Sequence, residues 1–118
     1  MASPAGLLLQ QYLSQLERWV DLAPGLRVCV HALRETELAQ LRDRPVLEVV
    51  ADRAVRWEGF SAAALLGAAV GSSDAVPFDR ALWSEAVRRN ADWAHKVSDT
   101  LVAEAQALLQ QRAAVSGN

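Results

Sequence analysis

The sequence predicts a small all-α protein, a bundle of about five helices joined by short loops. Apolar residues recur three or four positions apart in several segments, as they do on the buried stripe of an amphipathic helix. Ser, Asp and Pro stand where these segments begin, and such residues favour a helix start. Alanine, a strong helix former, occurs 22 times in 118 residues. This length suits one domain over residues 1–118, with a frayed C-terminus from about residue 113.

The first predicted helix begins at Ser3-Pro4, where the serine can cap free backbone N–H groups. Its apolar stripe comprises Leu9, Leu13, Leu16 and Val20. The segment Ala23-Pro24-Gly25 then ends the helix.

A strand pattern follows from Leu26 to Val30, because apolar residues alternate with Arg27 and Cys29. A lone strand cannot satisfy its backbone, so this one would need a partner, which another subunit could supply. The alternative is an extended connector.

The middle of the chain predicts two more helices. The first runs from Thr36 to about Arg42. The second restarts after Pro45 and runs from Val46 to about Trp57, with a valine-rich stripe on one side.

The second half predicts three helices. Ser61 can cap a short helix from Ala62 to Gly67 or Val70. Asp79 can cap a helix from Arg80 to about Asn90, and the last helix runs from Asp92 or Trp93 to Arg112.

Charge and hydropathy exclude several classes of function. Twelve Lys and Arg residues oppose fourteen Asp and Glu, so the formal charge is -2 and no basic nucleic-acid surface is expected. No apolar run approaches the roughly 20 residues of a membrane span. The N-terminus lacks the features of a signal peptide, so we expect a cytoplasmic protein without membrane contact.

Candidate chemistry is sparse. Cys29 and His31 would share one strand face as a nucleophile and its base, but no third group accompanies them. The alternative is a half-buried thiol beside a surface imidazole. His31 and His95 are too far apart for a recognised metal spacing. We therefore expect no enzyme activity, metal or cofactor.

Apolar side chains are the remaining feature that could carry function. Most of the four tryptophans join apolar stripes and are expected in the core, but tryptophan is enriched at interface anchors, so one or two could contact a partner. The run Leu7-Leu8-Leu9 is too wide for a single buried stripe and is a second interface candidate. The candidate partner surface comprises Leu7, Leu8, Trp19, Trp93 and Leu101.

Two short motifs resemble a known family. A Trp57-Glu58-Gly59 element is followed, after a polar loop, by Pro77-Phe78-Asp79 at the start of a helix. From Arg27 to Leu109 this arrangement resembles the tail assembly chaperones of long-tailed bacteriophages and prophages. The motif residues are Trp57, Gly59, Pro77, Phe78 and Asp79, and we expect them to form scaffold, since Gly59 permits a turn and Pro77-Phe78 positions a helix.

The resemblance implies a non-catalytic protein in the cytoplasm of the bacterial host. Such chaperones bind the tape measure protein and keep it soluble until tail tube subunits polymerise around it. In some of them a longer, frameshifted form recruits the tube protein. Self-association would help to cover a long client by multivalency. The alternative is a virion structural protein, such as a head–tail connector or tail completion protein.

Overall fold

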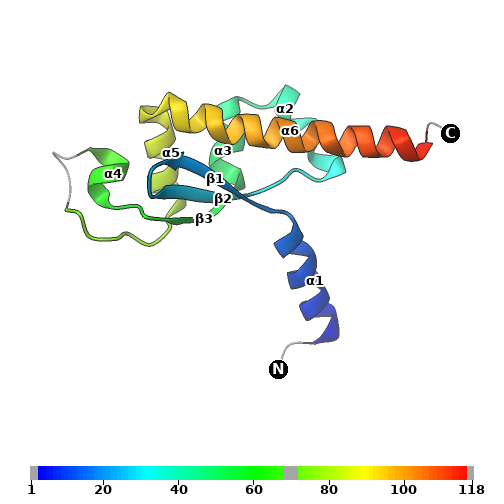
Figure 1. Cartoon of the computed structure of the whole chain (residues 1–118), viewed down its shortest axis with the longest axis horizontal. Helices are drawn as coiled ribbons and strands as arrows, with labels where there is room; N and C mark the ends of the chain where they lie inside the picture. The colour runs from blue at the N-terminus through cyan, green and yellow to red at the C-terminus, as the bar shows by residue number, and fades with distance from the viewer. Residues whose placement is uncertain (1–2, 68–71, 117–118) are drawn as a thin grey trace.

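The protein has an α/β fold in which helices pack on one face of a three-stranded antiparallel sheet (Figure 1). The computed structural model describes residues 3–67 and 72–116. The predicted all-α bundle with at most one short strand is therefore wrong. The sheet has the strand order β1-β2-β3, so β2 is its central strand.

The elements follow one another along the chain as α1 (Pro4–Gln15), β1 (Glu17–Ala23), β2 (Leu26–His31), the 3₁₀ turn η1 (Glu35–Glu37), α2 (Gln40–Asp43), α3 (Val46–Arg53), β3 (Ala54–Glu58), α4 (Ala62–Leu66), α5 (Arg80–Arg89) and α6 (Ala91–Ser116).

The first predicted helix is too long, because the chain leaves α1 at Gln15 and forms β1. A tight turn at Gly25, with φ at +78°, folds β1 back onto β2 as a hairpin. Val20 and Leu22, at alternate positions of β1, both point into the core. This strand period coexists in the sequence with the helical spacing of the apolar residues. Pairing with β2 decided between these two periods.

The predicted helix from Val46 to Trp57 is shortened in the same way. It ends at Arg53, and Ala54 adopts an extended conformation that starts β3. β3 pairs with β2 on the side away from β1. The predicted strand at Leu26–Val30 is therefore present, and both of its partners lie in the same chain rather than in another subunit.

Helical predictions in the second half agree better. The Asp79 side chain accepts a hydrogen bond from the Leu82 backbone and caps α5 as predicted. In the first half, by contrast, the region predicted as one helix from Thr36 splits into η1 and α2. The short helix α4 stops at Leu66 before Gly67, and the expected extension to Val70 lies outside the described residues. The last helix passes Arg112 and continues to Ser116.

The core lies between the sheet and helices α3, α5 and α6. Valines of β1 and β2 form its sheet side, and Trp83 of α5 is fully buried at its centre. The ring of Phe60 lies edge-on to Trp83, with centroids 6.4 Å apart, and to Trp93 at 5.6 Å. These aromatic contacts join α5, α6 and the loop after β3 into one unit.

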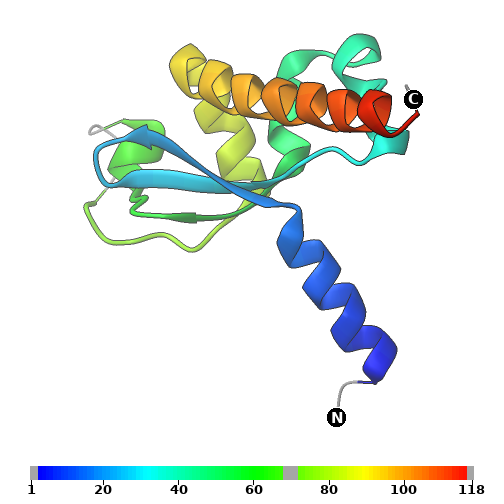
Figure 2. The same ribbon diagram turned by 45° about the vertical axis from the view of Figure 1, so that its right-hand side comes forward.

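The helix α1 projects from this body, as Figure 2 shows most clearly. None of its residues is buried. The Cα radius of gyration is 16.3 Å, whereas a compact domain of this length has about 13–14 Å. No helix in the described part of the chain is long and apolar enough to cross a membrane.

Candidate partner-binding site

Trp57 and Phe78 of the motif lie in contact, and Gly59 packs against the β1–β2 turn. Trp57 donates its indole N–H to the Val76 carbonyl at 2.7 Å, and its ring meets Phe78 edge-on at 5.0 Å. Gly59 has φ at +86°, and a Cβ there would lie 1.9 Å from the Gly25 carbonyl oxygen. The motif thus fixes the loop before α5 against the sheet, and these contacts are packing contacts.

Cys29 and His31 share the sheet face opposite the core, but their environment does not activate a nucleophile. Burial raises the pKa of the Cys29 thiol, and the charge of Glu17 adds to this effect. Burial lowers the pKa of His31, with a further contribution from the charge of Arg53. A nucleophilic cysteine needs the opposite shift, toward the thiolate.

No cluster of three metal-ligating side chains occurs within residues 3–67 and 72–116. His95 lies exposed on α6, whereas His31 lies on β2.

The projecting helix α1 carries an exposed apolar stripe. Ala5, Leu8, Leu9 and Tyr12 line one shallow hollow along it, at the spacing that places side chains on one helix face. Leu8 is 68% exposed. No charged side chain occurs between residue 1 and Leu16, so nothing polar competes with the stripe except neutral glutamines and serines. We call these four residues the α1 stripe.

The stripe continues into a notch between the end of α1 and the C-terminal half of α6. Tyr12 and Leu16 form one side of this hollow, which has a volume of about 370 Å³. Leu33, from the segment after β2, and Leu108 of α6 also line it. We call this hollow the notch.

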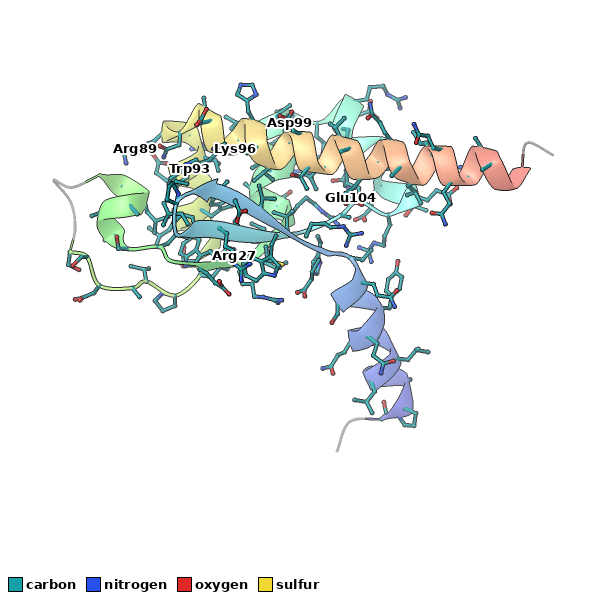
Figure 3. The ribbon with its side chains drawn as sticks, viewed as in Figure 1. Arg27, Arg89, Trp93, Lys96, Asp99 and Glu104 are labelled. Carbon is teal, nitrogen blue, oxygen red and sulfur yellow. The ribbon has the colours of Figure 1, made fainter. Side chains whose placement is uncertain are left out.

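Ion pairs surround the apolar lining of the notch. Arg18 of β1 pairs with Glu104 of α6 at 2.8 Å, and Figure 3 shows Glu104 on the side of α6 that faces β1. Arg112 forms a second pair with Glu35. An apolar floor within a charged rim is the arrangement that accepts an amphipathic helix.

The outer sheet face carries a second exposed aromatic. Trp19 lies beneath Arg27, whose guanidinium carbon is 4.2 Å from the ring centroid, and Arg56 approaches it at 5.5 Å. Each arginine is held by a carboxylate, Glu58 and Glu17 respectively. Trp19 is 36% exposed, and the charges of the two arginines beside it are balanced by the two carboxylates.

A further hollow of about 530 Å³ surrounds the β1–β2 turn. Lys96 of α6, labelled in Figure 3, donates to the Leu22 carbonyl at 2.8 Å and holds the hairpin to the helix. The lining of this hollow carries charges of both signs, from Asp21, Arg27 and Glu58. The ammonium group already serves the fold here.

The candidate partner residues divide into two groups. Leu7 and Leu8 are exposed on α1, and Trp19 is exposed on the outer face of the sheet. Trp93 and Leu101 lie instead in the core, where they are 8% and 1% exposed. Sequence reasoning missed Tyr12 and Leu108 as notch residues. The charge-free N-terminal segment indicates an apolar surface on α1, but no local pattern joins it to α6.

Comparison with protein-family models, with curated proteins and with solved structures finds no match for this chain.

Proposed function

We propose that this protein is a non-catalytic tail assembly chaperone that binds amphipathic helices of the phage tape measure protein and assists tail tube assembly. The notch carries the proposal, because it offers apolar side chains from two helices inside a charged rim. The Trp57-to-Asp79 motif, which resembles that family, supports it further.

The physical basis is burial of apolar surface in the notch. A client helix that enters it would cover Leu108 and Leu16, which are partly exposed without a partner. Full burial of such a side chain contributes about 1.5–3 kcal/mol before association costs are subtracted. One such contact is weak, so a long client with repeated helices would be held by many copies together.

The neutral surface fits a protein partner better than a polyanion. The formal charge is -2, and the ion pairs around the notch balance one another. Charged residues flanking the apolar face of a client helix could pair with this rim and fix its register. We place this activity in the cytoplasm of the bacterial host, with the tail tube protein as a second partner.

Co-expression with the tape measure protein of the same phage tests the proposal. The wild-type chain should co-purify with it, and Leu108→Glu should abolish this by placing a charge in the apolar lining. Gln106→Glu is the matched control, because this exposed residue lies on the same helix outside the notch lining. Equal capture by both variants, with unchanged thermal melts, would contradict the proposed site.

Mass spectrometry of finished virions separates the proposal from the structural alternative. A chaperone should be absent from purified particles. Stoichiometric presence would instead indicate a head–tail connector or tail completion protein.

A further inference from the structure

The exposed surface of this chain is larger than a monomer of its mass requires. A monomeric globular protein of 12.8 kDa exposes about 6,300 Å², whereas this chain exposes 7520 Å². The excess of about 1,200 Å² exceeds the roughly 800 Å² that each partner contributes to a standard protein interface. The projecting α1, which buries no side chain, contributes to this excess (Figure 2).

The chemistry of α1 indicates what covers it. The distal α1 stripe is apolar and 43–68% exposed at Leu8, Leu9 and Tyr12. The helix has no charged side chain from Pro4 to Gln15, so two copies can approach without electrostatic repulsion. An antiparallel pair of identical helices also places the positive end of each helix dipole beside the negative end of the other. Like-to-like contact through a two-fold axis is the commonest form of oligomer.

We propose that the α1 stripe is the interface of a symmetric dimer, in which α1 lies antiparallel to α1 of a second copy of this chain. Leu8 and Leu9 lie at the centre of the stripe and therefore near the two-fold axis, where each faces its equivalent or its neighbour in the other copy. Leu7 lies on the other side of the helix and stays outside the interface. This inference does not depend on the identity of any client.

Light scattering and analytical ultracentrifugation of the purified chain test the dimer without a client. The wild-type protein should have twice the chain mass of 12.8 kDa and dissociate along a dilution series. The double variant Leu8→Glu, Leu9→Glu should be monomeric. The control Gln10→Glu, Gln11→Glu adds the same two charges to the same turn away from the stripe and should remain dimeric. Because α1 buries no residue, both variants should keep the wild-type melting temperature of the body.

Disulfide trapping tests independently which face of α1 forms the interface. Leu8→Cys should give a covalent dimer under mild oxidation, whereas Gln10→Cys should not, and the buried Cys29 provides no competing thiol. A wild-type chain that is monomeric at every concentration would overturn the proposal. A dimer that survives the double leucine variant would also overturn it, because another surface would then hold the copies together. Neither result bears on the capture of the tape measure protein through Leu108, so the two proposals fail separately.

Discussion

Arg53 and Glu37 form a half-buried ion pair that locks the end of the sheet to the following turn. The guanidinium Nη1 lies 2.9 Å from Oε2 of Glu37, and the two side chains are 11% and 17% exposed. The same guanidinium donates to the carbonyls of His31 and Ala32 where β2 ends. One side chain from α3 therefore fixes the path from the central strand into η1.

We expect the titration of Glu37 to make the free energy of unfolding depend on pH in the acid range. Hydrogen bonding from Arg34, supported by the charge of Arg53, lowers the pKa of Glu37 from 4.5 to about 2. The unfolded chain binds the proton more readily, so the stabilisation is complete above about pH 5 and is lost as the pH falls toward 2. Its upper limit is about 3 kcal/mol, and solvent screening reduces this to about 1–2 kcal/mol.

Urea unfolding between pH 5 and pH 2 measures this contribution. In the wild-type protein the free energy of unfolding should fall more steeply than in Glu37→Gln, which keeps the shape of the side chain without its titration. The other carboxylates contribute equally to both proteins. Parallel pH profiles would show that Glu37 has no lowered pKa.

Two glycines offer a matched test of backbone strain against steric fit. Gly25 and Gly59 both have positive φ, but a Cβ at Gly25 meets nothing within 4 Å, whereas one at Gly59 lies 1.9 Å from the Gly25 carbonyl oxygen. Gly25→Ala should cost about 1 kcal/mol from conformational strain alone. Gly59→Ala should cost about 3 kcal/mol or more, since the backbone of the β1–β2 turn must also move. Equal melting temperatures would contradict this close approach.

Local sequence signals predicted the start of a helix where an N-cap side chain bonds to a backbone N–H of the same segment. Asp79 specified α5 because its cap requires only a neighbour three residues away. The strands β1 and β3 escaped prediction because Val20 and Trp57 also fit a helical stripe. Only pairing with β2, between 3 and 31 residues distant at the register positions, distinguishes the two conformations. The notch was equally unpredictable, since it joins residues of α1 and α6 that are about ninety positions apart.

The thiol of Cys29 should react only after the protein opens. The side chain is fully buried, and burial raises its pKa above the ordinary value, so little thiolate meets solvent. Alkylation at neutral pH should be slower by about a hundredfold or more in the folded protein than in urea. Gly59→Ala, being less stable, should react faster than wild type under native conditions. A native rate equal to that of the unfolded chain would place Cys29 at the surface.

Trp57 should stabilise the fold through its indole N–H as well as through its ring. Trp57→Phe keeps an aromatic ring near Phe60 and Phe78 but removes the donor that reaches the Val76 carbonyl at 2.7 Å. The lost volume and the unpaired carbonyl should together cost about 1–3 kcal/mol. The control is Trp19→Phe, at a ring that is 36% exposed, and it should cost less than about 1 kcal/mol. Urea unfolding followed by circular dichroism measures both without relying on tryptophan emission, and a larger loss for Trp19→Phe would assign the anchoring role to the outer sheet face instead.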